Sequence, residues 1–426
     1  MSTSIIPGFY QMTPAERALK IGELTGLSAD ELRLITEKDA LSLDLADHMI
    51  ENVIGTYSLP MGIALNFLIN GKEVLIPMVT EEASVVAAAS NAAKMARAGG
   101  GFSASFTGPV MIAQVQIINV PDPNHVKNVI LQNKETIKEI CNAKDPVLVQ
   151  FGGGFHDLDV RVIDTIRGKM VIVHLLVNVG DAMGANAVNT MAEAVAPYLE
   201  EKTGYKVDLR ILSNLAVYRL ARASAVFTKA SLSKTGDPAD GADVIEKILD
   251  AYAFAEADPF RAATHNKGVM NGISAAVLAT GNDTRAIESG AHAYAAFKGR
   301  YTTLTTWEKT GGGDLTGTIE VPMAVGLVGG ATKTHPGARA AVKILGVKTA
   351  AELAMIFAAV GLAQNLSAIR ALATDGIQKG HMKLHARNIA ASVGAAGETL
   401  EKIVSQMIAD KNINAVYAAE LYAKFK

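Results

Sequence analysis

Cysteine is almost missing from this chain: Cys141 is the one cysteine among 426 residues. A single cysteine excludes an internal disulfide and a cysteine-based metal cluster, and it fits a reducing, cytoplasmic setting. Charge is also sparse, at 19% of residues, and nearly balanced between 40 basic and 42 acidic side chains. With no basic tail and no acidic block, a nucleic-acid partner is not expected.

Signals of targeting and of common nucleotide sites are missing as well. The N-terminal residues carry no basic region followed by an apolar core, so no signal peptide is expected. The longest uncharged run, between Glu352 and Arg370, falls short of the ~20 residues of a membrane span, so we expect a soluble protein without a membrane segment. The fingerprints G-x-G-x-x-G, G-x-x-x-x-G-K-[ST] and H-E-x-x-H are absent, which argues against a Rossmann domain, a P-loop and a zinc site, and no metal is expected.

The chain does contain enough apolar sequence, 49% of residues, for the cores of two or three domains. Residues 12–50 are typical of short amphipathic helices that begin at a capping Thr or Ser. The Asn70-Gly71 pair between two apolar runs predicts a hairpin. Residues 80–101 predict a helix capped by Thr80; small apolar residues occupy every side of it, so we expect it to be the buried central helix of a large domain.

Residues 114–213 follow a different pattern, β-α-β-β-α-β, which is the split ferredoxin-like arrangement of a compact α/β sandwich. Helices and short strands return after it, so we predict an α+β protein in which this small domain is inserted into a large, mostly helical one. The last residues predict a helical pair that follows the hinge-like segment 375–380. The expected parts are a large domain (1–109 and 217–375), a small domain (110–216) and a C-terminal lid (376–426).

Four ionisable residues stand where an ordinary structural explanation is incomplete. Glu82 would be a second acid in the first turn of an apolar helix, and Lys267 lies in a cation-rich segment, 261–272, that we expect to be a loop. Each has a structural alternative: Glu82 as a helix-dipole acid, Lys267 as a solvated loop lysine, Asp283 as a turn or N-cap residue, and His381, like His385 one turn later, as a surface histidine.

The segment around residues 180–189 predicts an anion site. Gly180, Gly184 and Ala185 at a strand-to-helix junction let the backbone approach a ligand closely, and free N–H groups at the helix N-terminus favour an anion such as pyrophosphate. A tight turn explains the small residues equally well. It does not explain the accompanying Asp181, Asn186 and Asn189.

These motifs together resemble the soluble class II form of 3-hydroxy-3-methylglutaryl-coenzyme A (HMG-CoA) reductase. The resemblance runs essentially end to end through ENVIGTYSLPMGIALNF, EEASVVAAAS, DAMGAN, LRILSNLA, THNKGVMNG, ATGNDTRAIE, VGLVGGATKTHP and GIQKGHMKLHARN. It implies a small domain that binds a nicotinamide dinucleotide without a Rossmann fold. It also implies a homodimer, or a higher even oligomer, with active sites at the subunit interface.

The resemblance carries functional residues over by position. The implied catalytic residues are Glu82, Lys267, Asp283 and His381, and the implied substrate-binding residues are Arg261, Asn271, Ser84 and Gln364. The implied cofactor-binding residues are Asp145, Asp181, Met183, Gly184, Ala185, Asn186, Asn189 and Asn214. An acid at position 145, near the adenosine ribose, favours NAD(H) over NADP(H), because it accepts hydrogen bonds from ribose hydroxyls and repels a 2′-phosphate. The structural alternative for Asp145 is a helix-terminating Asp-Pro turn, and the adjacent Lys144 could soften the repulsion.

The implied reaction is the four-electron interconversion of HMG-CoA with mevalonate and free coenzyme A, using two dinucleotides. Lys267 would stabilise the oxyanion, His381 would protonate the coenzyme A thiolate, and Glu82 would protonate the second carbonyl oxygen. Asp283 would orient the lysine. Two other classes remain open: a coenzyme A-binding module without chemistry, and an acyltransferase that uses His381 as its base. The same residues serve both directions of the reaction.

Overall fold

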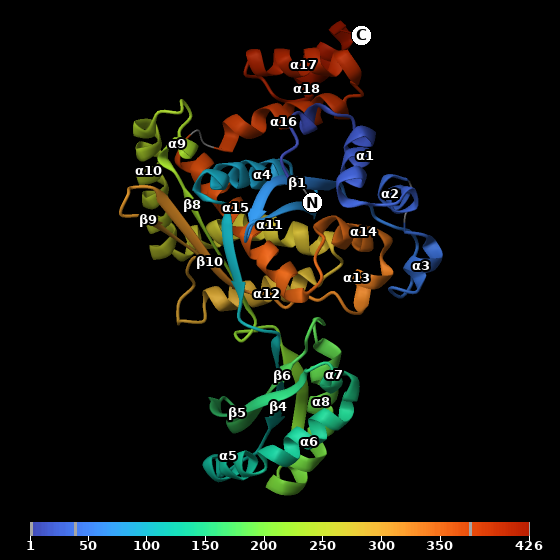
Figure 1. The fold of residues 1–426 in the computed structure, drawn as a ribbon, viewed down its shortest axis with the longest axis vertical. Coiled ribbons are helices and arrows are strands. Elements are labelled where there is room, and N and C mark those ends of the chain that lie inside the picture. The colour runs from blue at the N-terminus through green and yellow to red at the C-terminus, as the bar shows by residue number, and fades with distance from the viewer. Residues whose placement is uncertain (1–2, 38–40, 375–376, 426) are drawn as a thin grey trace.

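The computed structural model describes residues 3–37, 41–374 and 377–425, with backbone alone for 377–384. Two sheets organise them, which confirms the predicted α+β class. Figure 1 shows a central body, a lobe attached below it through a narrow neck, and a helical layer above it. The body and the lobe each contain one of the sheets.

The body is built on a six-stranded sheet with the order β2-β1-β3-β8-β10-β9. Its strands are β1 (Met61–Ile69), β2 (Lys72–Val79), β3 (Phe102–Phe106), β8 (Leu220–Phe227), β9 (Thr305–Lys309) and β10 (Leu315–Pro322). The predicted hairpin joins β1 to β2, and both Asn70 and Gly71 have positive φ, as a two-residue primed turn requires.

Helices pack around this sheet. They are η1 (Phe9–Gln11), α1 (Pro14–Thr25), α2 (Ala29–Thr36), α3 (Leu43–Asp47), α4 (Val85–Ala96), η2 (Arg97–Gly99), α9 (Lys229–Leu232), α10 (Pro238–Ala257), α11 (Pro259–Ala279), α12 (Thr284–Ala295), α13 (Gly330–Thr334), α14 (Pro336–Leu345) and α15 (Ala350–Ala373). The two N-terminal helices start as predicted, since Thr13 with Glu16 and Ser28 with Glu31 form capping boxes.

The central helix is α15, and the prediction that residues 80–101 supply it was wrong. α15 has its two charged residues near its ends and is buried on nearly all sides, from Leu353 to Leu366. Its length and composition would allow it to cross a membrane, but 78% of the relevant window is buried inside the protein, as in a core helix. α4 buries one side only and exposes Ala87, Asn91 and Lys94.

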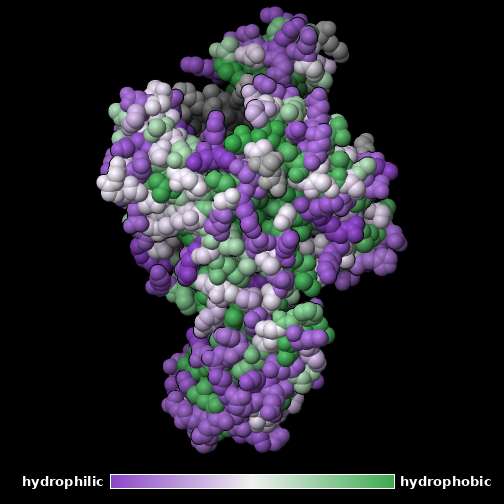
Figure 2. All heavy atoms as spheres, in the orientation of Figure 1, coloured by the Kyte–Doolittle hydropathy of each residue, from purple (hydrophilic) through white to green (hydrophobic). Residues whose placement is uncertain are grey.

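The lobe has the predicted element order. Its strands are β4 (Val110–Ile117), β5 (Gly154–Thr165), β6 (Gly168–Asn178) and β7 (Val207–Ser213), and its helices are α5 (Pro123–Gln132), α6 (Lys134–Lys144), α7 (Pro146–Gln150) and α8 (Ala185–Thr203). The strand order β5-β6-β4-β7, with every pair antiparallel, is that of the split β-α-β arrangement. The face of this lobe seen in Figure 2 is mostly hydrophilic.

The C-terminal layer consists of three helices, α16 (Ile377–Ser392), α17 (Gly397–Ala409) and α18 (Ala415–Phe425), where a pair was predicted. Their buried residues, among them Ala390, Ile403, Met407 and Leu421, form a hydrophobic cluster of their own, separate from the main core. This layer is therefore a small packed unit in its own right.

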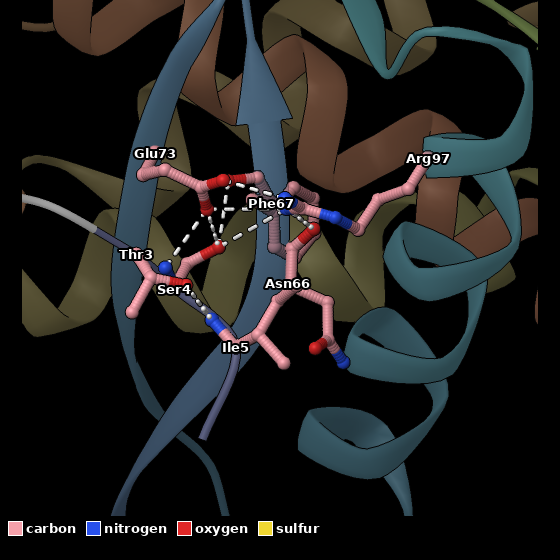
Figure 3. Close-up of polar contacts among 7 residues, drawn as sticks. All are labelled: Thr3, Ser4, Ile5, Asn66, Phe67, Glu73 and Arg97. Atoms are coloured by element: carbon pink, nitrogen blue, oxygen red, sulfur yellow. Dashed lines mark hydrogen bonds and ion pairs between the residues drawn. The ribbon is translucent and has the colours of Figure 1, made fainter. Parts of the chain in front are cut away.

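A polar cluster fixes the N-terminal end of the chain to the body (Figure 3). Ser4 is fully buried; its N–H donates to Glu73 at 2.8 Å, and its hydroxyl donates to the carbonyl oxygen of Phe67. Arg97 pairs with Glu73 at 2.5 Å, and this guanidinium lowers the pKa of Glu73 to about 2. The cluster ties the first residues to the β1–β2 hairpin that leads to Glu82.

Candidate active site

Helix α11 carries the cation-rich segment, so the prediction of a loop at residues 261–272 was wrong. Asp258 caps the helix by accepting the N–H of Arg261 at 2.9 Å, and Pro259 occupies the first position. The glycines serve packing and not turning: a Cβ at Gly272 would lie 2.8 Å from Gln364 Cβ on α15. One side of α11 is thereby pressed onto the central helix, and the opposite side leaves Lys267 exposed.

Glu82 lies just before α4, in a bend, and not in the first turn of a helix as predicted. Its N–H donates to Thr80 Oγ1 at 3.1 Å, so Thr80 closes this bend instead of capping a helix. The N-cap of α4 is Ser84, which has φ 75° and makes no side-chain cap bond. A serine in the left-handed region costs free energy of about 1 kcal/mol, so the surrounding structure imposes this backbone shape.

Glu82 meets Lys267 and Asn271, which lie one turn apart on α11 and far from Glu82 in the sequence. Lys267 Nζ lies 2.6 Å from Glu82 Oε2, and Asn271 Nδ2 donates to Glu82 Oε1 at 3.2 Å. The side chains of Lys267 and Glu82 are 58% and 39% exposed, and an ion pair that open to water contributes little to stability. The three residues instead place an ammonium, a carboxyl and an amide group together at one accessible point.

Asp283 is placed as an N-cap in this conformation. Its Oδ1 accepts the N–H groups of Arg285 and Ala286 at 2.9 and 3.1 Å, and its Oδ2 lies 3.3 Å from the Arg285 guanidinium. Between Asp283 and Lys267, both of which the structure describes, there is no ion pair. The structural alternative for Asp283 is thus realised here, and the partner of Oδ2 among the described residues, Arg285, is mostly exposed.

Two predicted substrate residues have polar groups that lack partners. The guanidinium of Arg261 is half-buried, burial lowers its pKa, and no carboxylate in the described part of the chain pairs with it. Gln364 is 5% exposed, and its Oε1 has no hydrogen-bond partner among the described residues. A half-buried cation is suited to a small anionic ligand, and the unpaired amide oxygen is suited to a ligand hydroxyl that donates a hydrogen bond.

His381 lies within the span of α16, but its side chain is outside the part of the structure that is described. The fourth predicted catalytic residue is therefore neither joined to the other three nor separated from them by the structure. His385 on the same helix is exposed.

The predicted anion site lies at the neck, between β6 and α8. Gly184 is the N-cap of α8 with φ 97°, and a Cβ there would lie 2.5 Å from Val179 Cγ1, so a glycine is required. Asp181 Oδ1 accepts the N–H of Ala350 at 2.7 Å, and Asn189 Oδ1 accepts that of Leu212 at 2.8 Å. Both side chains therefore have a structural role as acceptors of backbone N–H groups, and the sequence pattern did not predict this role.

The remaining predicted cofactor residues differ in exposure. Ala185 begins α8, Asn186 and Asn214 are exposed, and Met183, in the loop before α8, is half-buried. Asp145 stands between α6 and α7, where its Oδ1 accepts the N–H of Leu148 at 2.9 Å. This cap is the turn function that was the structural alternative for Asp145.

A hydrogen-bonded chain beside the site was not expected from the sequence. Ser274, one turn beyond Asn271, donates to Glu288, whose Oε2 lies 3.2 Å from His292 Nε2; His292 Nδ1 lies 2.8 Å from the Tyr301 hydroxyl. The Glu288–His292 spacing of four residues was the available signal. A cavity of about 860 Å³ lies elsewhere, on β3, β8 and β10, and none of the predicted site residues line it.

Comparisons with known proteins agree on one family. Residues 13–386 match the family model described as hydroxymethylglutaryl-coenzyme A reductase. The chain is 58% identical over 424 residues to 3-hydroxy-3-methylglutaryl-coenzyme A reductase of Archaeoglobus fulgidus, covering 100% of this chain and 95% of that one. It is 38% identical over 347 residues to the probable reductase of Borreliella burgdorferi, covering 81% and 78%.

Solved structures give the same result. The reductase of Streptococcus pneumoniae superposes with a TM-score of 0.84 at 39% identity over 99% of both chains. A class II reductase structure from the same organism, bound to NADPH in open conformations, superposes with a TM-score of 0.83 at 40% identity over 86% of this chain and 99% of that one.

Proposed function

The chain belongs to the hydroxymethylglutaryl-coenzyme A reductase family and is an oxidoreductase acting on HMG-CoA, and we propose that it interconverts HMG-CoA with (R)-mevalonate and free coenzyme A in two hydride transfers. The observation that supports this at the level of residues is the meeting of Lys267, Glu82 and Asn271. A nicotinamide dinucleotide supplies the hydride when it is bound. The protein's residues bind, orient and protonate the substrate.

The first proposed step depends on Lys267. Hydride addition to the thioester carbon places a negative charge on the carbonyl oxygen, and a nearby ammonium stabilises that oxyanion. Arg261 would hold the substrate's free carboxylate, since its guanidinium has no carboxylate partner in the described residues. Asn271 and Ser84 would bind polar groups of the same end, and Gln364 would complete the wall behind them.

Asp283 is proposed to orient Lys267. Its Oδ1 is committed to the cap of α12, while the partner of Oδ2 among the described residues is Arg285, whose side chain is 86% exposed. Such an exposed pair is weak, so Oδ2 can exchange it for an ammonium at small cost. Glu82, already 2.6 Å from Lys267, would then act as the acid that protonates the second carbonyl oxygen.

His381 is proposed as the acid that protonates the leaving thiolate. A free thiol has a pKa near ~8.5, so an imidazolium can transfer its proton to the thiolate at neutral pH and prevent return attack. The separate hydrophobic cluster of α16–α18 supports the idea that this layer moves as a unit, as a lid over bound substrates.

The substitution His381→Gln should slow thioester reduction by about tenfold or more and leave the reduction of added mevaldehyde near the wild-type rate. Only the first half-reaction produces a thiolate, which is the physical reason for the difference. Initial rates of the two half-reactions would be compared in one preparation, with His385→Gln as the matched control on the same helix. An equal loss in both half-reactions would assign His381 a structural role or another step.

The cofactor is a nicotinamide dinucleotide, and we propose NAD(H) over NADP(H). The glycine N-cap of α8 fits the close approach of a pyrophosphate. Asp145 Oδ1 is occupied by the cap of α7, which leaves Oδ2 to accept a hydrogen bond from a ribose hydroxyl. Lys144, exposed next to it, would be the competing phosphate ligand.

Wild-type protein should therefore show a higher kcat/KM with NADH than with NADPH, and Asp145→Asn should narrow the gap. Two like charges ~4 Å apart repel by about 4 kcal/mol at an effective dielectric near 20, so a preference of tens-fold to a thousand-fold is expected after partial exposure. The asparagine keeps the cap of α7. Equal or better efficiency with NADPH in the wild type would move phosphate recognition to Lys144.

A homodimer with active sites at the subunit interface is proposed as well. The segment before β1 exposes Ile54 completely and Tyr57 to 91%, and both precede the β1–β2 hairpin that leads to Glu82. Apolar side chains left so open in one copy are suited to burial by a second copy. Light scattering should give a mass near twice 44.7 kDa. We further propose a cytoplasmic location.

The function is tested by mixing the protein with HMG-CoA and NADH and following the loss of NADH absorbance together with the release of coenzyme A thiol. Two NADH consumed per thiol support the reductase. Binding of coenzyme A without oxidation would instead support the coenzyme A-binding module. Thiol release without NADH consumption would support an acyltransferase.

A further inference from the structure

Arg219 is a buried arginine that has no acidic hydrogen-bond partner in the described part of the chain. Its side chain is 0% exposed and lies just before β8, at the neck between body and lobe. Nη1 donates to the carbonyl of Met183 at 3.0 Å, and Nη2 donates to the carbonyls of Ala182, at 3.0 Å, and Val325. One guanidinium thus joins the loop before α8 to a segment of the body.

The loop between β6 and α8 is docked on the body at further points. Leu327 N–H donates to the carbonyl of Asp181 at 2.8 Å, and the Asp181 side chain accepts the first N–H of α15. Gly326 packs so closely that a Cβ there would lie 2.4 Å from the nitrogen of Met183. The loop's conformation is therefore set by the body and not by the lobe alone.

The arginine also determines which way the loop's peptide groups face. The carbonyls of Ala182 and Met183 both point at the guanidinium. Across a trans peptide the C=O and N–H bonds point in opposite directions, and no peptide among the described residues is cis. The N–H groups of Met183 and Gly184 therefore point away from Arg219, next to the free N–H groups that begin α8.

The positive charge of Arg219 also favours an anion at this loop. Burial lowers the pKa of Arg219 to about 10, while the nearby Asp181 carboxylate acts to raise it, so the guanidinium stays charged at neutral pH. This buried cation contacts the loop that leads into the N-terminus of a 19-residue helix. Both contribute positive potential where the loop meets α8.

We propose that Arg219 is a positioning residue for the dinucleotide: it holds loop 181–184 against the body in the shape that binds the pyrophosphate. This rests on the proposed binding of the dinucleotide at that loop. Arg219 touches neither substrate nor cofactor in this assignment; it acts through the backbone of Ala182 and Met183. Because Val325 is the third acceptor, the body's segment 325–328 takes part in cofactor affinity.

The test compares Arg219→Lys and Arg219→Met with Arg222→Met in the full-length protein. Arg222 is the matched control, because it lies three residues later, pairs with Glu320 and is half exposed. We expect NADH to bind Arg219→Lys at least about tenfold more weakly, since one ammonium cannot satisfy three carbonyls spread across a guanidinium. The dissociation constant for HMG-CoA should change less than twofold, and kcat at saturating NADH should be mostly retained.

A second variant tests the same proposal if the Arg219 variants fail to fold. Gly326→Ala pushes on the same loop from the body side and removes no charge, and it should weaken NADH binding in the same selective way. Thermal melting verifies that each variant is folded. NADH affinity unchanged in folded Arg219→Lys and in Gly326→Ala would overturn the proposal, as would an equal loss of HMG-CoA affinity. Failure of the wild type to bind NADH would instead contradict the proposed function.

Discussion

Replacing Lys267 with alanine is expected to lower kcat by a factor of ~10² or more while HMG-CoA binds with near-normal affinity. The lysine's proposed work is done when charge develops on the thioester oxygen, so its removal raises the free energy of the transition state more than that of the bound substrate. Steady-state turnover and a separate binding titration with HMG-CoA measure the two effects.

The matched control is Lys247→Ala. Lys247 Nζ lies 2.6 Å from Asp243 in an exposed helical pair, the same separation as in the Lys267–Glu82 pair, so general effects of losing such an ion pair appear there as well. Lys267→Arg retains the positive charge and is expected to retain more turnover than alanine. A Lys267→Ala turnover within tenfold of wild type would refute the proposed role.

Local signals in the sequence predicted much of the secondary structure. Capping boxes at Thr13 and Ser28 and the Asn70-Gly71 turn are set by short-range hydrogen bonds and by φ preferences, which neighbouring residues reveal. The element order of the lobe followed from alternating and helical periodicities. In each case the information lies within a few residues of the element it specifies.

Segment 261–272 shows where such reasoning fails. Its glycines, asparagines and cations have the composition of a loop, yet it lies within α11 and begins at the third residue of that helix. Gly272 is needed because α11 approaches α15 closely there, a contact between residues about ninety positions apart. Similarly, alanine-rich residues 85–96 suit a buried and a half-exposed helix equally well, and only packing decides between them.

In the candidate site, too, tertiary contacts decide what local sequence patterns cannot. Glu82, Lys267 and Asn271 converge, and family resemblance named all three, although no local pattern links residues 185 positions apart. The structural duties of Asp181, Asn189 and Asp283 depend on backbone N–H groups that become available only after folding. Arg219 has no sequence signal, since a buried and an exposed arginine look alike in a strand-like segment.

Glu82→Gln should lower the reduction of added mevaldehyde by a factor of ~10² or more, because an amide cannot donate the proton that the second carbonyl oxygen requires. The glutamine keeps an oxygen for the bond from Asn271, so the bend before α4 should persist. The matched control is Glu81→Gln, the neighbouring acid, which is exposed. Rates with mevaldehyde and with HMG-CoA are measured separately.

The pattern across two substitutions is the sharper test. His381→Gln is expected to impair the thioester half-reaction selectively, because a thiolate leaves only in that half-reaction. Glu82→Gln is expected to impair the aldehyde half-reaction, because the carbonyl oxygen must take up a proton there to become the product hydroxyl. Some loss of thioester reduction is also expected in Glu82→Gln, since Lys267 loses its anionic partner at 2.6 Å. If Glu82→Gln reduces added mevaldehyde at the wild-type rate, the proton must come from another group, and Asp283 becomes the candidate.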